Sequence, residues 1–233
     1  MKEMLTNKIL TGLREPEFAR LLPLLQPVSL SAGQRLVEAG EMMRFIYFPE
    51  SCVLSCQADM QDGKSAEVGM IGFEGVAGIT ALIGSSPTVH SLNVSVAGSA
   101  LRVSTDDFKR EITRGDGVQQ SLLAYAGAYI TQVSQRSACT IFHIVAERFA
   151  VWLLLLHDRT GEDLIHITQE QIADHLGVRR AGVTVVAGAM QAAGAITYRR
   201  GNLRINDRRM LEDMACECYG ALRSVGRHQT TYM

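Results

Sequence analysis

Arginines concentrate in one stretch of this chain, and a guanidinium group can hydrogen-bond to phosphates and to base edges. The 233 residues carry a formal net charge of −1. Residues 168–209 nevertheless hold seven arginines against three acidic residues, which leaves a net charge of −5 for the remainder. Because attraction to phosphates is local, a confined basic segment is typical of a nucleic-acid contact. On charge alone, a solvated basic face is the alternative.

Two helices joined by a tight turn are predicted for residues 167–186. Thr168 and Gln171 have the spacing of a capping box, in which each side chain satisfies a backbone donor at a helix start. Gly177 can adopt the left-handed conformation that ends a helix. The next helix has an inward apolar stripe formed by Val183, Val186, Ala187 and Met190. Together these signals are typical of a helix-turn-helix.

Three polar residues at the start of the second helix are left facing outward. Arg180 and Thr184 lie one turn apart, and Arg179 precedes them. Recognition helices place their N-terminal residues against base edges. We therefore predict that Arg179, Arg180 and Thr184 contact double-stranded DNA.

A β-hairpin is predicted next, because residues 196–205 alternate apolar and polar side chains around the pair Gly201-Asn202. This hairpin would place Arg199, Arg200 and Arg204 at or near the tip of a wing, where they can reach the phosphate backbone. A simple helix pair with a surface hairpin is the alternative to a winged helix-turn-helix.

The sequence also predicts the elements that precede the winged helix-turn-helix. Residues 1–25 have apolar side chains at helical spacing, which indicates a short helical lead-in ending at Pro23. Residues 28–103 contain short apolar and β-branched runs separated by turn residues, which favours an antiparallel sandwich or barrel. A helix apolar on most sides is expected at about 144–158, inside the C-terminal domain.

A long helix is predicted from about residue 116 to 136, where turn signals are nearly absent. A narrow apolar stripe with steps of four, three and four would suit a partner helix, and its members are Leu122, Ala126, Tyr129 and Val133. Packing of this stripe on the helix's own domain is the alternative.

In this order of segments the chain resembles the CRP/FNR family of transcription regulators. Residues 30–40, LSAGQRLVEAG, resemble the family's early β-roll signature, and residues 167–205 resemble its DNA-binding motif. The resemblance implies an α+β fold with an N-terminal antiparallel, jelly-roll-like β-roll, a long dimerisation helix and a C-terminal winged helix-turn-helix. The corresponding domains are 1–115, 116–138 and 139–233. It also implies a homodimer that binds DNA and RNA polymerase.

The recognition helix departs from the family pattern. The family's frequent Arg-Glu…Arg appears here as Arg180-Ala181…Val185, so only Arg180 is retained. We therefore expect a base preference different from the familiar family operator.

The region that binds the effector in the family also departs from the family pattern. Cyclic-nucleotide-binding relatives have a cassette that begins Gly-Glu and ends with an arginine that neutralises the cyclic phosphate. Here residues 72–75 read Gly-Phe-Glu-Gly, the later cassette reads SSPTVHS at 85–91, and residues 65–101 contain no Lys or Arg. Burying a phosphate without a cation costs several kcal/mol, although backbone amides of a glycine-rich loop could offset part of that cost.

We therefore predict a regulator that does not respond to a cyclic nucleotide; a cyclic-nucleotide-dependent activator is the alternative. Glu74 and His90 are the only residues with ionisable side chains between Val68 and Leu101. An unidentified effector would bind near these two side chains and the glycines Gly72 and Gly75. Tight corners of a β-roll are the simpler explanation for those glycines.

The five cysteines do not have the spacing of a disulfide framework and are expected to be reduced thiols. Cys52 and Cys56 would lie about 13 Å apart on one strand, and Cys216 and Cys218 would point about 200° apart on a helix. Neither pair by itself forms a metal site, and the clustered N-terminal cysteines of the family's iron-sulfur sensors are missing. No metal or cofactor is expected. A redox role for Cys139 or for the C-terminal pair is the alternative to plain buried thiols.

Other classes of protein find little support. The sequence has no visible signal peptide and no apolar run near the roughly 20 residues that cross a bilayer, so a cytoplasmic location without membrane contact is expected. Phosphate-loop, nucleophile-elbow and His-Glu-x-x-His motifs are missing, and enzymatic activity is not expected. A signalling or scaffold module that does not bind DNA is the remaining alternative.

Overall fold

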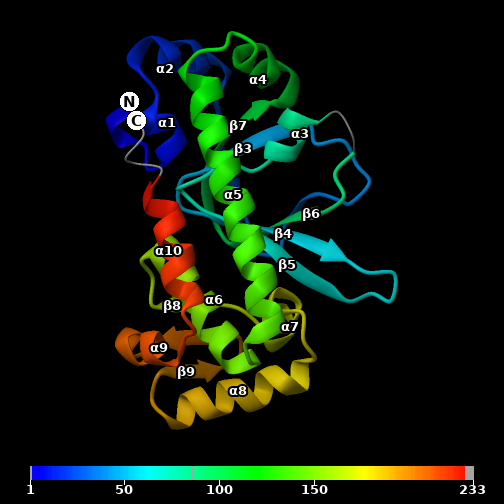
Figure 1. Cartoon of the computed structure of the whole chain (residues 1–233), viewed down its shortest axis with the longest axis vertical. Helices are drawn as coiled ribbons and strands as arrows, with labels where there is room; N and C mark the ends of the chain where they lie inside the picture. Colours follow the sequence, from blue (N-terminus) through cyan, green and yellow to red (C-terminus); the bar gives the residue numbers. More distant parts are fainter. Residues whose placement is uncertain (1, 85–86, 229–233) are drawn as a thin grey trace.

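The computed structural model describes residues 2–84 and 87–228, with side chains through Arg223. A long helix, α5 (Gly117–Phe142), runs along the molecule; an N-terminal β-roll packs against its first part and a C-terminal domain lies around its end (Figure 1). Within the described residues, no helix is both long and apolar enough to cross a bilayer.

The β-roll consists of two antiparallel sheets with strand orders β1-β7-β3 and β2-β6-β4-β5. Their inner faces bury the apolar side chains of the alternating runs. The strands are β1 (Gln26–Leu30), β2 (Arg35–Val37), β3 (Phe45–Pro49), β4 (Val53–Asp59), β5 (Ser65–Ile71), β6 (Ser91–Val96) and β7 (Gly98–Ser104).

Short helices precede and follow the strands of the β-roll. The predicted lead-in forms two of them, α1 (Lys8–Gly12) and α2 (Glu15–Leu21), while α3 (Ile79–Ile83) and α4 (Thr105–Ile112) follow strands of the roll. Single 3-10 turns lie at Lys2–Met4 and Leu22–Leu24. Ser104 caps α4 by accepting a hydrogen bond from the Asp107 amide.

Helix α5 packs on its own domain with the face that the sequence pattern assigned to a partner helix. Leu122 and Ala126 of the predicted partner stripe are buried against the β-roll, and Tyr129 packs on the same core. The outward face includes Leu123, 60% exposed, and Ile130, 64% exposed. Leu122 and Ala126 therefore pack on the helix's own domain, the alternative that the pattern left open, because the β-roll, which the helix pattern alone does not reveal, covers this apolar face. The helix also continues to Phe142, beyond residue 138.

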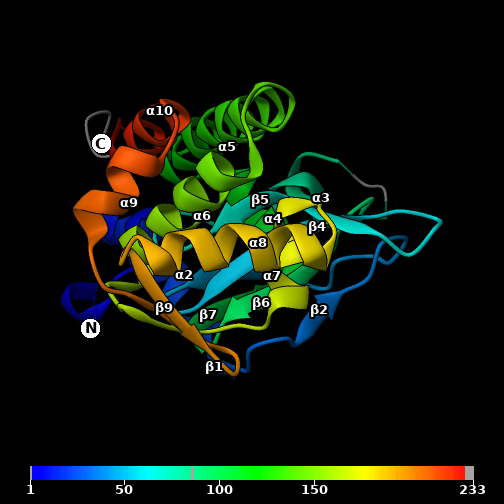
Figure 2. The same cartoon turned by 90° about the horizontal axis from the view of Figure 1, so that it is seen from below.

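The C-terminal domain is built around α6 (Val145–Thr160), whose residues 149–156 are all buried. Around it lie α7 (Gln169–Leu176), α8 (Arg180–Ala192), α9 (Arg208–Met214) and α10 (Cys218–His228), as the view in Figure 2 shows from below. The sheet of this domain has the order β8-β10-β9, with β9 (Ile196–Arg199) and β10 (Asn202–Ile205). Its third strand, β8 (Leu164–His166), was not foreseen from sequence.

Two buried ion-pair contacts hold the C-terminal domain against the β-roll. Glu67 of β5 lies 2.7 Å from the Arg136 guanidinium and 2.9 Å from Nδ1 of His175 in α7. Arg159 of α6 lies 2.8 Å from the Glu74 carboxylate. The orientation of the helix-turn-helix is therefore tied to β5 and the loop that follows it through buried polar and charged groups.

Candidate nucleic-acid interface

The helix-turn-helix forms as its local signals predict. Thr168 and Gln171 make the capping box of α7, and Gly177 ends that helix with a φ of 64°. Helix α8 then begins at Arg180, after a three-residue connection from the end of α7 at Leu176. Because Val183, Ala187 and their stripe are buried, the opposite face of α8 is presented outward.

The three predicted groove residues lie together at the exposed start of α8. Arg179 is the N-cap residue of the helix, Arg180 is its first residue, and both are exposed. Thr184 is also exposed, and its hydroxyl donates to the Gln169 side chain of α7 over 2.8 Å. Gln169 therefore fixes the threonine hydroxyl, a contact that the sequence alone did not indicate.

Val185 was noted only as a departure from the family pattern, yet it lies on the same outward face and is 73% exposed. An exposed aliphatic side chain on a recognition helix can pack on the methyl group of thymine. Its position next to Thr184, away from the buried stripe, was the signal that could have identified it.

The wing turns one residue earlier than predicted. Arg200 and Gly201 are the turn residues, with φ of 50° and 80°, while Asn202 already pairs with Arg199 in the ladder. Two consecutive positive φ values define the tight turn that matches strand twist, and a glycine at its second position removes the steric cost there. The prediction of Gly201-Asn202 as the turn is wrong because the pairing register, fixed by buried Ile196, Leu203 and Ile205, leaves Arg200 in the loop.

This register places Arg199 and Arg200 at the wing tip, whereas Arg204 lies farther back, opposite Thr197. The wing is fixed to the helix-turn-helix by Tyr198, whose hydroxyl donates to the Ile167 carbonyl over 2.9 Å. Across the part of the chain that the structure describes, no ion pair involves these wing arginines or Arg179 and Arg180. Their positive charge is thus free to meet phosphates.

A cavity of about 530 Å³ lies between the β-roll and α5. Its wall includes Val68 and Ile71 of β5, Ile79 of α3, and Tyr129 and Ile130 of α5. This size is within the range of small-molecule sites. Among its described lining residues there is no Lys or Arg, so the cavity offers an apolar surface with few polar groups.

Of the predicted effector residues, only His90 lines this cavity. Glu74 instead makes its buried contact with Arg159 of α6, and Gly72 lies beside that pair. Gly75 allows close approach of the Tyr125 ring of α5. Placing Glu74 with His90 was wrong, because α6, which is distant in sequence, supplies the carboxylate's partner. Ser85 and Ser86 of the later cassette lie outside the described residues.

The polar groups in the cavity are predominantly neutral. Burial raises the pKa of the Cys56 thiol to about 11, and burial likewise raises the pKa of the Tyr129 hydroxyl well above its ordinary value. A buried phosphate would therefore meet no guanidinium or ammonium group from the described lining residues. The site is better matched to a ligand with little charge.

A β-roll joined by a long helix to an exposed, basic helix-turn-helix and wing defines a two-domain DNA-binding regulator. Residues 27–114 match the model of the cyclic nucleotide-binding domain, and residues 147–214 match that of the Crp-like helix-turn-helix domain. The chain belongs to the CRP/FNR family of DNA-binding transcription regulators.

Solved structures share this fold at low sequence identity. A CRP/FNR-family regulator from Eubacterium rectale superposes with a TM-score of 0.70 at 16% identity, covering 90% of this chain and 98% of that one. FixK2 from Bradyrhizobium japonicum gives 0.68 at 14% identity, covering 82% and 98%. A CRP-family regulator from Thermus thermophilus gives 0.68 at 17% identity, covering 81% and 96%. No curated protein matches the chain by sequence.

Proposed function

We propose that the chain acts in the cytoplasm as a homodimeric regulator that binds a two-fold DNA site and responds to a signal other than a cyclic nucleotide. The observation that carries the dimer is the outward face of α5. Its exposed residues recur in steps of four and three, and they are Leu123, Gly127, Ile130, Ser134, Ser137 and Ile141. Steps of this kind form the seam of a two-helix coiled coil. We call this row the α5 seam.

The α5 seam contains three large apolar side chains that the β-roll leaves exposed, namely Leu123, Ile130 and Ile141. Small residues in it, such as Gly127 and Ser134, allow close approach of a second helix. Two copies of α5 side by side would present two α8 helices to successive major grooves, as dimeric helix-turn-helix proteins do. A second copy of the chain is thus the proposed occupant of this face.

Substitution of the α5 seam tests the dimer. We expect Leu123→Glu/Ile130→Glu to be monomeric at micromolar concentration in sedimentation velocity, because two carboxylates would face their equivalents across the seam. The monomer would bind a palindromic site at least about 100-fold more weakly, since the second half-site is lost. Met42→Glu, which changes an exposed apolar residue of the β-roll, serves as the control. A wild-type monomer, or a variant that remains dimeric, would contradict the proposal.

For DNA contact we propose that Arg179 and Arg180 read base edges, that Thr184 and Val185 lie against neighbouring bases, and that the wing arginines bind phosphates. The support is their shared exposure at the start of α8 and at the wing. Contact with RNA polymerase, expected from the family, would follow binding.

The cavity beside α5 is the proposed effector site, and its apolar wall supports an effector with little charge. Ile130 and Ser134 line this cavity and also belong to the α5 seam. A bound effector would therefore touch the surface through which the copies associate. This shared position offers a route from effector binding to dimer geometry.

Titration calorimetry tests the effector class. We expect no heat of binding for cyclic AMP or cyclic GMP up to high micromolar concentration, because no Lys or Arg lies among the described residues that line the cavity. The CLP regulator of Xanthomonas campestris, similar in fold (TM-score 0.64, 15% identity), is described as responsive to c-di-GMP, so that nucleotide belongs in the same titration. Micromolar affinity for any of these three nucleotides would overturn the proposal.

A further inference from the structure

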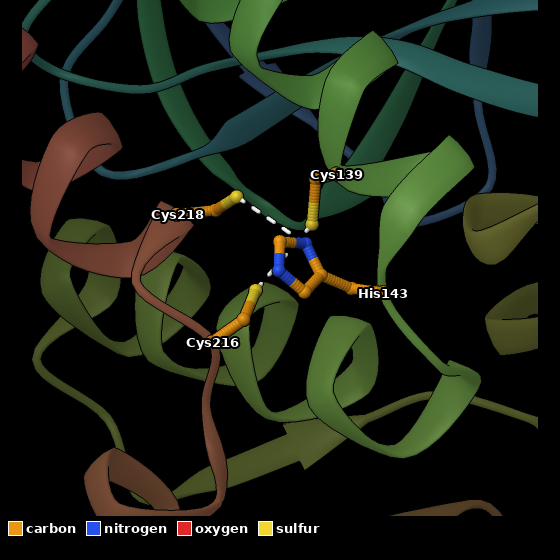
Figure 3. Close-up of side chains that lie close together, drawn as sticks. All are labelled: Cys139, His143, Cys216 and Cys218. Atoms are coloured by element: carbon orange, nitrogen blue, oxygen red, sulfur yellow. Dashed lines mark hydrogen bonds between the residues drawn. The ribbon is translucent and has the colours of Figure 1, made fainter.

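Three cysteines and a histidine meet where α5 ends and α10 begins. Cys139 and His143 lie one turn apart at the end of α5, and Cys216 and Cys218 come from the segment that leads from α9 into α10. Figure 3 shows the three sulfur atoms around the His143 imidazole.

The two C-terminal cysteines point to the same place because they do not share a helix. Cys216 precedes α10, which starts at Cys218. The expectation that they point about 200° apart on one helix was therefore wrong. Considering each pair separately also missed Cys139 and His143, which only the packing of α10 on α5 brings near.

The separations of the four side chains suit one tetrahedral ion. Their ligand atoms all lie within 4.8 Å of one another. Sγ of Cys139 is 3.6 Å from Sγ of Cys216, and Sγ of Cys218 is 3.6 Å from Nδ1 of His143. Zn–S bonds of about 2.3 Å and Zn–N bonds of about 2.0 Å at tetrahedral angles place two sulfurs about 3.8 Å apart and sulfur and nitrogen about 3.5 Å apart.

Neighbouring groups complete such a site. Nε2 of His143, the nitrogen that faces away from Cys218, lies 3.2 Å from the Glu217 carboxylate, the arrangement that commonly orients a metal-bound imidazole. The Gln135 amide donates to Sγ of Cys218 over 3.1 Å. All three cysteines are buried, Cys218 being 1% exposed. Plain packing does not require three thiols and an imidazole with this outer support.

We propose that Cys139, His143, Cys216 and Cys218 bind one Zn²⁺ ion in a tetrahedral Cys₃His site. Binding would release the three thiol protons to solvent and form three Zn–S bonds and one Zn–N bond, with no change of oxidation state. With four protein ligands no position remains for substrate, so the ion is structural. It links α10 to the end of α5, at the junction between the long helix and the DNA-binding domain.

The test measures metal in the full-length protein, purified without a metal-affinity column. We expect one zinc per chain by elemental analysis and native mass spectrometry, and cobalt substitution should give thiolate-to-metal charge-transfer and tetrahedral ligand-field bands. Cys216→Ser and His143→Gln should lose stoichiometric metal. Cys56→Ser, a cysteine of the β-roll outside the cluster, should retain it.

Glu217→Ala provides a variant that folds, because this side chain is 81% exposed. It should keep the circular dichroism of the wild type while metal affinity, measured by chelator competition, falls about 10- to 100-fold. Chelation should also speed hydrogen exchange in residues 216–228 of the wild type, and added zinc should reverse this. A metal-free wild type that fails to bind cobalt tetrahedrally, an iron-sulfur spectrum, or a Cys139–Cys216 disulfide in place of bound metal would overturn the proposal.

Discussion

Arg179→Ala/Arg180→Ala is expected to abolish sequence-specific DNA binding while leaving the fold intact. Both side chains are exposed and neither is paired within the described structure, so their removal exposes no buried partner. A base-reading arginine contributes about 1–3 kcal/mol. Loss of two in each subunit should therefore weaken binding by at least about 100-fold.

The measurement is fluorescence anisotropy at fixed salt, with an operator obtained by binding-site selection. Arg44→Ala/Arg110→Ala removes the same charge from the β-roll, where both residues are exposed, and controls for the general loss of positive charge. Removing Arg199 and Arg200 of the wing should instead weaken binding to all sequences and reduce its salt dependence. Unchanged affinity in the α8 variant would remove α8 from the interface.

Glu67→Ala is expected to have the largest effect on stability. The carboxylate is fully buried between Arg136 and His175, so its removal leaves a buried guanidinium without its counterion. Breaking a buried pair in this way costs about 3–5 kcal/mol. Urea denaturation at neutral pH should show this loss, while Glu3→Ala, at an exposed site, should stay within about 0.5 kcal/mol of the wild type. A similar loss in both variants would contradict the role of Glu67.

The Glu67 carboxylate also predicts that the stability of the protein falls at acid pH. Burial alone would raise the pKa of Glu67, but Arg136 and then His175 lower it from 4.5 to about 2. Because the folded-state pKa is below the unfolded one, the contribution is present above pH 4.5 and is lost as the pH falls toward 2. At full size, this contribution to the free energy of unfolding is about 3 kcal/mol. The difference in free energy of unfolding between wild type and Glu67→Gln should shrink as the pH falls from 4.5 toward 2. A difference that stays constant over this range would show that Glu67 is not the source of the acid dependence.

Local signals in the sequence were sufficient to predict the two helices of the helix-turn-helix. Thr168 and Gln171 satisfy donors within their own first turn, and Gly177 supplies a backbone conformation at one position. Neither depends on distant residues, which is why the positions of α7 and α8 and the exposure of Arg179 and Arg180 could be predicted. Alternation of apolar residues likewise indicated the β-roll strands, since their period of two is a property of the strand itself.

The tertiary structure alone decided how these elements face one another. The pattern of α5 contains two apolar stripes one residue apart, and only contact with the β-roll shows that Leu122 is covered while Leu123 is free. Partners far apart in the chain, such as Arg159 for Glu74 or Cys139 for Cys216, follow from packing rather than spacing. The sequence by itself thus determined a helix-turn-helix regulator with a β-roll, because caps, turns and periodicity act over a few residues. The exposed α5 seam, the cavity beside α5 and the cysteine-histidine cluster required the fold, because only long-range packing decides which side chains are covered and which come together.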